Sequence, residues 1–216
     1  MEHSSFPILL AVLLLGALIG FGYTRGKRNN RSIYLSAFRD LEKLFRPDDR
    51  TYTAIGGLVG HHANFRFDRR EPFFEIDATI TLLPRHTPLY LPISKMTMKN
   101  DRLYVTLYMR YPPPCEGHLI EKGHAASRGA AITHEHRLDR EEVRWGELVF
   151  YLYYERMKMR ELFLAFMREN PDPRTIRHIA VTADERRAYI YLIPERGTVA
   201  GVIEPVHRFF ESVFTQ

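Results

Sequence analysis

Cysteine is almost missing from this sequence: Cys115 is the only one among 216 residues. A single cysteine excludes an intrachain disulfide, so the fold has no covalent cross-link to stabilise it. This usage is typical of a domain in a reducing cytoplasm, although exported prokaryotic proteins also often lack cysteine pairs.

Recognisable catalytic motifs are missing as well. The sequence has no G-x-S-x-G nucleophile motif, no P-loop, no H-E-x-x-H zinc motif and no dinucleotide-binding fingerprint. The glycines of GGLVG at residues 56–60 do not lead into a Lys-Ser or Lys-Thr pair. We interpret them as a bent or bulged strand and not as a phosphate-binding loop. Motifs alone therefore indicate no enzyme class.

Charge is absent from one long N-terminal stretch, the eighteen residues Phe6–Tyr23. As a helix this stretch would span about 27 Å, close to the roughly 30 Å of hydrocarbon in a bilayer. The sequence therefore predicts a transmembrane helix at residues 6–24, preceded by a tail at residues 1–5. A cleaved signal peptide and a buried core helix are the alternatives. The first requires positive charge before the apolar stretch, which the tail lacks.

Four cations follow the apolar stretch within seven positions, in a basic juxtamembrane segment at residues 25–31. Lysine and arginine are retained on the cytoplasmic side of membranes, and they also attract anionic lipid headgroups. We therefore predict a single-pass signal-anchor in the cell membrane, with the N-terminus outside and the domain in the cytoplasm; the opposite orientation is the alternative. The predicted headgroup contacts are Arg25, Lys27, Arg28 and Arg31.

Within the apolar stretch, Gly16 and Gly20 form a G-x-x-x-G pair. Two small residues on one helix face allow a second helix to approach closely, so this face is a candidate for homodimer formation through the anchor. Glycine is also common in transmembrane helices, and this simpler explanation remains open.

The basic pI of 9.3 does not by itself indicate a nucleic-acid partner. From residue 32 onward, 27 lysines and arginines are balanced by 25 aspartates and glutamates, so most of the excess lies beside the predicted membrane segment. No run of interleaved basic and aromatic residues resembles a nucleic-acid platform. We therefore expect no nucleic-acid partner.

Residues 32–216 predict one globular α+β domain, built mainly from antiparallel sheet with helices packed on one face. Its helices show apolar spacings of three and four residues, and its strands alternate apolar and polar positions. We expect Pro205 in the first turn of the terminal helix. The predicted elements are a helix at 32–45, strands at 52–67, 73–83, 89–96 and 102–110, and a final β-α-β-β-α unit at 146–154, 157–170, 176–183, 187–194 and the C-terminus.

Residues 111–137 carry three prolines near their start and predict a long loop with one helical turn. Four of the ten histidines fall within 19 residues of this loop. Zinc takes three or four nitrogen, sulfur or oxygen ligands, but the spacing here matches no ligand pattern, and a solvated polar loop is the simpler interpretation. The candidate metal ligands are His118, His124, His134, His136 and Cys115.

Two function hypotheses follow. The leading one is a membrane-anchored binding domain with an unknown protein partner, no cofactor and no catalytic residues. The alternative is a membrane-tethered, zinc-dependent hydrolase that uses the histidine-rich loop. Tyrosines crowd the C-terminal strands, where they serve either sheet packing or a binding surface. They are Tyr151, Tyr153, Tyr154, Tyr189 and Tyr191.

Overall fold

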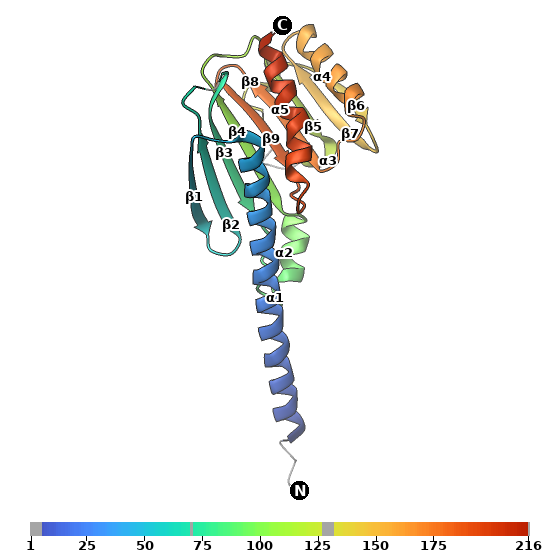
Figure 1. Cartoon of the computed structure of the whole chain (residues 1–216). Helices are drawn as coiled ribbons and strands as arrows, with labels where there is room; N and C mark the ends of the chain where they lie inside the picture. The colour runs from blue at the N-terminus through green and yellow to red at the C-terminus, as the bar shows by residue number, and fades with distance from the viewer. Residues whose placement is uncertain (1–5, 70, 127–131, 216) are drawn as a thin grey trace.

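The computed structural model describes residues 6–69, 71–126 and 132–215, so the predicted tail at residues 1–5 lies outside the described residues. A long helix, α1 (Phe6–Phe45), leads into an antiparallel sheet with nine strands in the described part of the chain. Figure 1 shows α1 and the terminal helix lying across the sheet, while the N-terminal half of α1 projects away from it. The predicted α+β class is confirmed.

Three segments that we predicted separately form one helix. We expected a basic segment at 25–31 and a new helix from residue 32, but α1 runs without a break for 40 residues. Arginine and lysine are good helix formers, and no glycine or proline interrupts α1 after residue 26. The helix ends at Phe45, where Arg46 takes a left-handed conformation with φ 48° and Pro47 follows.

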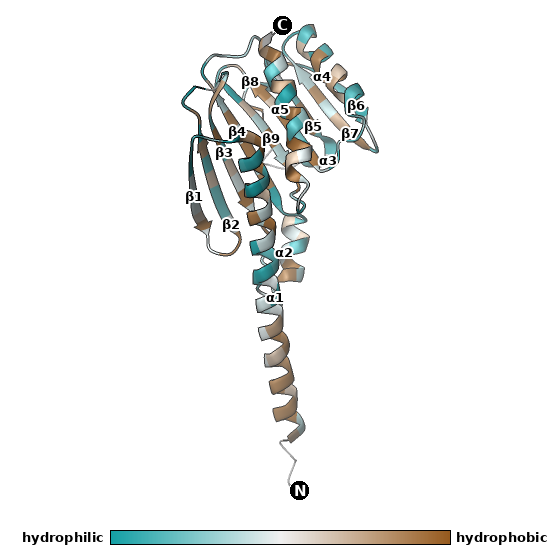
Figure 2. Cartoon of the chain, viewed as in Figure 1, coloured by the Kyte–Doolittle hydropathy of each residue, from teal (hydrophilic) through white to brown (hydrophobic). Residues whose placement is uncertain are grey.

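The two halves of α1 have different surroundings. Its most apolar eighteen-residue window is long enough to cross a membrane, and none of that window is buried against the described residues. Figure 2 shows this half as a hydrophobic rod outside the domain. The second half buries one side at spacings of three and four residues, namely Gly26, Asn30, Ile33, Ala37, Phe38, Leu41 and Phe45.

Neighbouring strands of the sheet run antiparallel in the order β1-β2-β3-β4-β9-β8-β5-β7-β6. The strands predicted at 73–83, 102–110, 146–154, 176–183 and 187–194 are confirmed as β3, β4, β7, β8 and β9. The strands are β1 (Asp49–Gly56), β2 (Gly60–Arg66), β3 (Phe73–Thr81), β4 (Arg102–Met109), β5 (Gly117–Glu121), β6 (Asp139–Trp145), β7 (Leu148–Tyr154), β8 (Ile176–Thr182) and β9 (Arg187–Leu192).

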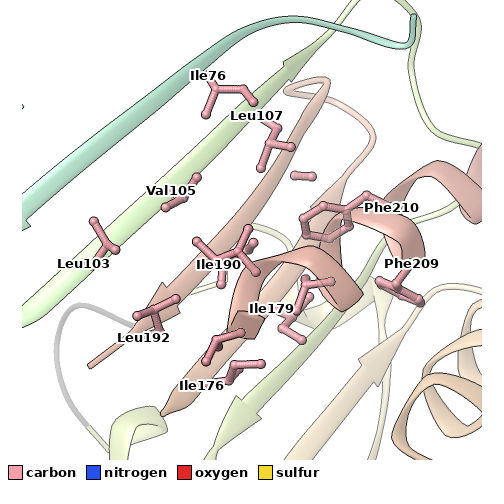
Figure 3. Packing of buried hydrophobic residues seen from close by; sticks show 14 of the residues in the cluster. Ile76, Leu103, Val105, Leu107, Ile176, Ile179, Ile190, Leu192, Phe209 and Phe210 are labelled. Atoms are coloured by element: carbon pink, nitrogen blue, oxygen red, sulfur yellow. The ribbon is translucent and has the colours of Figure 1, made fainter. Parts of the chain in front are cut away.

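Helices α4 (Met157–Glu169) and α5 (Val199–Thr215) pack with the second half of α1 over one face of the sheet. Figure 3 shows α5 placing Phe209 and Phe210 over apolar side chains of the central strands, such as Ile179 and Ile190. Each such side chain contributes about 1.5–3 kcal/mol by leaving water. This layer is the hydrophobic core of the domain.

Pro205 lies inside α5 and not in its first turn, because the helix already begins at Val199. A proline inside a helix leaves the carbonyl four residues earlier without its usual N–H donor. Here that carbonyl belongs to Gly201, and Nη1 of Arg174 donates a hydrogen bond to it at 3.1 Å. A side chain from the loop before β8 thus replaces the missing backbone donor.

Two predicted strands were wrong. Residues 52–67 form the β1–β2 hairpin and not one bent strand, and Gly57 supplies the positive φ of 58° that its turn requires. Residues 89–96 fall largely in a helix, α2 (Leu91–Met98). Pro92 explains the second error, because its missing N–H costs nothing in the first turn of a helix but would remove a ladder bond in a strand.

The predicted loop at 111–137 was also wrong in part. It contains β5, which lies in the sheet between β8 and β7. The helical turn expected in this segment is present as α3 (Lys122–Ala125). A short 3₁₀ turn follows at Glu135–Arg137, while residues 127–131 lie outside the described residues. β5 is only five residues long and both of its partner strands come later in the chain, so local sequence pattern could not reveal it.

Candidate ligand-binding site

The face of the sheet opposite α1, α4 and α5 is polar and aromatic, and we call it the free face. Side chains alternate across a strand, so the apolar core positions leave their neighbours on this face. Part of it, over β5 and β7, is covered by α3 and by Ile132 and Leu138. The free face carries His62, Asn64, Asp77, Tyr104, Thr106, Tyr108, His118, Tyr151, Tyr153, His178, Tyr189 and Tyr191.

Strand register brings histidines and tyrosines of the free face together. His178 lies beside Tyr191 of β9 in the ladder, and its ring is 5.1 Å from that of Tyr189. Tyr104 of β4 approaches Tyr191 with ring centroids 5.0 Å apart. Of the five tyrosines noted in the sequence, four share this face, whereas Tyr154 packs against the core.

A cavity of about 290 Å³ opens on this face, over β4, β9, β8 and β5. The turn between β8 and β9 forms one side, and the segment around His134 forms another. Its lining is Thr106, Glu116, His118, Ile132, Thr133, His134, His178, Ala180, Thr182, Asp184, Glu185, Arg187 and Tyr189.

His118 and His178 occupy the floor of this cavity with their ring centroids 5.7 Å apart. Nε2 of His118 lies 2.9 Å from Oε1 of Glu116, which fixes the orientation of that ring. The other ring nitrogen of His118 and both ring nitrogens of His178 have no hydrogen-bond partner among the described residues. Because only 7% of His178 is exposed, water does not readily satisfy these atoms.

Burial keeps the ring of His178 on the cavity floor uncharged. The pKa of His178 is well below its usual value, first because the ring is buried and then because His118 and His124 lie nearby. Burial likewise raises the pKa of Tyr189. A neutral imidazole offers one donor and one acceptor, so His178 presents unused hydrogen-bonding groups to a neutral polar ligand.

The rim of the cavity, by contrast, is charged. Oδ2 of Asp184 lies 3.7 Å from His134 and 3.8 Å from Arg137, and Glu185 pairs with Arg187 at 3.3 Å. These pairs are exposed, and such pairs contribute little to stability. Their alternating signs favour a ligand that carries both donors and acceptors, as a peptide segment does.

The structure separates the residues we considered as metal ligands. Cys115 is buried in the hydrophobic core, where burial and the nearby Glu155 raise the pKa of its thiol. His134 and His136 lie together near the cavity rim, with ring centroids 6.1 Å apart. Among the residues that the structure describes, no three His, Cys, Asp or Glu side chains form a group that could hold a metal ion.

His118 and His124 both lie near His178, a residue that was not among the candidates from the sequence. The ring of His178 lies 5.7 Å from that of His118 and 6.0 Å from that of His124, although 54 residues separate it from the nearer of the two in the chain. One signal was present: in IRHIAVTA, His178 is a polar residue directly before the apolar run of Ile179, Ala180 and Val181. Only the pairing of β5 with β8 shows what it faces.

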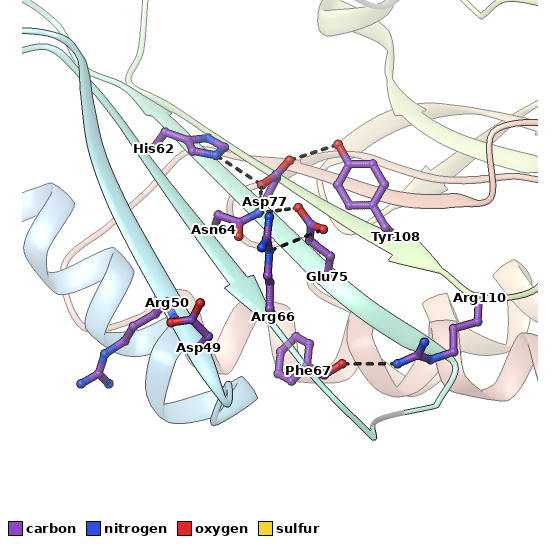
Figure 4. Close-up of polar contacts among 10 residues, drawn as sticks. All are labelled: Asp49, Arg50, His62, Asn64, Arg66, Phe67, Glu75, Asp77, Tyr108 and Arg110. Atoms are coloured by element: carbon purple, nitrogen blue, oxygen red, sulfur yellow. Dashed lines mark hydrogen bonds and ion pairs between the residues drawn. The ribbon is translucent and has the colours of Figure 1, made fainter.

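A second polar cluster lies on β2, β3 and β4, and its groups satisfy one another (Figure 4). His62 contacts Thr79 at 2.9 Å and Asp77 at 3.2 Å. Asn64 donates to Glu75 and to Asp77 at 2.6 and 2.8 Å. His61, the neighbour of His62 in the chain, faces the opposite side of the sheet and stacks on Tyr34 of α1. Because its hydrogen bonds are internal, this cluster stabilises the sheet and is a weaker ligand candidate than the cavity.

Comparisons with known proteins do not identify this chain. No protein-family profile matches it, and no curated protein matches it significantly. Its function must therefore be argued from its own geometry.

The predicted headgroup and dimer-face residues all lie on α1. Arg25, Lys27, Arg28 and Arg31 are exposed on α1 just beyond the apolar stretch. Gly16 and Gly20 are exposed too, and a Cβ built on either would meet nothing within 4 Å. A homodimer through this glycine face stays a prediction.

Proposed function

We propose that this protein is a single-pass membrane protein whose α+β domain is held at the cytoplasmic face and binds a partner through the cavity on its free face. One observation carries the placement. The apolar half of α1 is free of the domain, while the second half of the same helix is built into the hydrophobic core. An exposed apolar helix of this length matches the hydrocarbon core of a bilayer, where a helix satisfies its own backbone hydrogen bonds.

Continuity of α1 supports a retained anchor over a cleaved signal. Signal cleavage would fall near Gly20 and Gly22, inside a helix whose following turns already pack on the domain. The chain before the apolar stretch also lacks the positive charge that a signal peptide carries. The exposed cations after the stretch support the cytoplasmic orientation.

The binding role is supported by His178. Buried polar groups are normally hydrogen-bonded, and an unpaired one costs about 1–3 kcal/mol. An imidazole with two unpaired nitrogens on a cavity floor is therefore better explained by a ligand than by folding. We assign the site to a partner segment that supplies hydrogen-bond donors and acceptors, such as an extended peptide.

Replacing His178 by leucine tests this assignment. Because the ring makes no hydrogen bond to the described residues, we expect His178→Leu to leave the free energy of unfolding at pH 7.5 unchanged or up to about 1 kcal/mol higher. The measurement is urea unfolding of the full chain in detergent, followed by fluorescence of the single tryptophan, Trp145, which is buried. A loss above 1 kcal/mol would show that the imidazole is structural.

The matched control is Asn64→Leu, on the same face. Asn64 donates two hydrogen bonds to carboxylates, so its loss should cost about 1–3 kcal/mol. A pH series adds a second readout. Unfolded His178 takes up a proton near pH 6.5 but the folded ring does so only at lower pH, so wild-type stability should fall as pH drops below about 6.5. The leucine variant should lose part of this dependence, and His61 and His124 should retain the rest.

A further inference from the structure

Helix α2 exposes apolar side chains that its own packing does not explain. It is eight residues long, and only Ser94 is buried. Apolar residues on one short exposed helix usually mark an interaction surface. The exposed ones on α2 and just before it are Leu89 at 72%, Tyr90 at 53%, Ile93 at 55% and Met96 at 82%.

The position at which the segment before α2 contacts α1 indicates what covers the exposed apolar side chains of α2. A Cβ built on Gly22 would lie 2.5 Å from Cγ of Pro88, and the ring of Tyr23 is 6.1 Å from that of His86. Residues 86–88 therefore touch α1 where its uncharged stretch ends, at the level of the bilayer surface. Figures 1 and 2 show α2 beside α1, on the side of the domain from which the hydrophobic rod leaves.

A groove of about 950 Å³ separates α2 from α1 at this level, and its charged lining is cationic. Arg25 and Arg28 contribute from α1, and no carboxylate lines the groove among the described residues. Arg85 is already paired with Asp101 at 2.7 Å. The remaining cations, which form no ion pair with a described residue, are Arg25, Arg28, Lys95 and Arg196.

We propose that α2 lies in the membrane interface and that this groove binds the phosphate headgroup of an anionic phospholipid. The inference rests on the proposed anchoring of α1. Apolar side chains enter the acyl boundary while lysine and arginine remain at headgroup level, which matches the arrangement on α2 and the groove. Arginine also matches phosphate geometry through paired N–H donors. A docked protein helix would need acidic groups and would not depend on lipid charge.

Depth measurement tests the position of α2. A nitroxide is attached at Ile93→Cys in the full chain carrying Cys115→Ala, reconstituted in phosphatidylcholine–phosphatidylglycerol nanodiscs. The control position is Met157→Cys, which is 56% exposed and lies on α4, far from the hydrophobic rod. We expect the Ile93 label to be accessible to oxygen and protected from a nickel chelate, and the Met157 label to show the reverse. Equal nickel access at both positions would overturn the proposal.

Lipid selectivity tests the groove. The full chain in the same nanodiscs is compared for retention of spin-labelled phosphatidylglycerol against spin-labelled phosphatidylcholine. Removing two groove cations, in Arg25→Gln with Arg28→Gln, should lower this preference about fivefold or more. The matched control removes Lys27 and Arg31, which lie on the same turns of α1 outside the groove.

The outcomes separate the two proposals. Lost preference in the groove variant alone supports a headgroup site. Equal loss in both variants would show diffuse attraction to the surface, and no loss in either would exclude lipid; each overturns the inference while leaving the anchor intact. A chain that fails to enter nanodiscs at all would overturn the anchoring proposal and this inference with it.

Discussion

Replacing Gly26 by alanine should lower the free energy of unfolding of the domain by about 2–3 kcal/mol. A Cβ at this position would overlap the carbonyl group of Arg85 and lie 2.6 Å from the backbone nitrogen of His86. Both are backbone atoms, which cannot turn aside as a flexible side chain does. The better helix propensity of alanine, about 1 kcal/mol, offsets only part of the cost.

Gly16→Ala is the matched control for this prediction. Gly16 lies in the same helix, but a Cβ there would meet nothing within 4 Å, so its replacement should leave the domain as stable as the wild type. Both variants are compared by urea unfolding of the full chain in detergent, with Trp145 as the probe. If Gly26→Ala unfolds at the wild-type urea concentration, α1 does not dock on the loop before α2 as described.

Replacing Asp101 by alanine should cost more, about 3–5 kcal/mol, because it leaves a partly buried charge unpaired. Asp101 is 6% exposed and holds Arg85 through two hydrogen bonds of 2.7 and 2.8 Å. The same carboxylate accepts a hydrogen bond from the backbone N–H of Leu83 at 2.8 Å. Removing it leaves both the guanidinium of Arg85 and the backbone N–H of Leu83 without this hydrogen-bond acceptor.

The contacts of Asp101 continue into α1 through Asn30. This side chain accepts a hydrogen bond from Arg85 and donates to the carbonyls of Leu58 and Leu83. Asp101, Arg85 and Asn30 therefore form a clasp that joins α1 to the β1–β2 turn and to the loop before α2. The loss of Asp101 should loosen α1 as well as lower global stability.

The control for the clasp is an exposed ion pair. Glu71→Ala removes the partner of Arg110 at 3.6 Å, and because Glu71 is 59% exposed we expect a loss below about 1 kcal/mol. Hydrogen exchange of α1 amides adds a local readout: residues near Asn30 should exchange faster in Asp101→Ala and at the wild-type rate in Glu71→Ala. Equal effects of the two substitutions on stability would mean that the clasp is no stronger than a surface pair.

The clasp fixes the orientation of the domain relative to α1. Because α1 is one helix with one face built into the core, the anchor cannot swivel against the sheet without breaking buried contacts. With the first half of α1 in a bilayer, as we propose, the free face and its cavity are held at a set angle to the membrane. A break in the helix at residues 25–31, the predicted basic juxtamembrane segment, would have left that angle undefined.

Much of this fold could be predicted because local patterns sufficed. Each of the patterns that gave a correct prediction lies within one helix or strand. They are the uncharged stretch before Arg25, the alternation in β3 and β4 and the apolar side of α5. The sequence did not predict secondary structure correctly where it depends on the exact position of one residue within an element. Residues from Leu89 to Met96 were predicted as a strand but lie largely in a helix. Pro92 is tolerated there because it falls in the first turn of that helix.

The cavity could not be predicted because it depends on long-range pairing. His118 lies in a strand too short to recognise, and it meets His178 only because β5 inserts beside β8. The sequence did place His118 among the candidate residues, but with loop neighbours as its expected partners. The groove beside α2 was hidden for the same reason: Lys95 and Arg196 come from distant segments that meet Arg25 only in the folded chain.

The central claim, that Phe6–Tyr23 lies in hydrocarbon, is tested most directly by alkaline carbonate extraction of membranes containing the full chain. The account predicts that the wild type stays in the membrane pellet. It also predicts that Leu13→Arg moves into the supernatant, because arginine at a bilayer centre costs about 2.5–3.5 kcal/mol. Leu13 is 62% exposed, so this substitution should not disturb the domain. Wild-type protein in the carbonate supernatant would contradict the account.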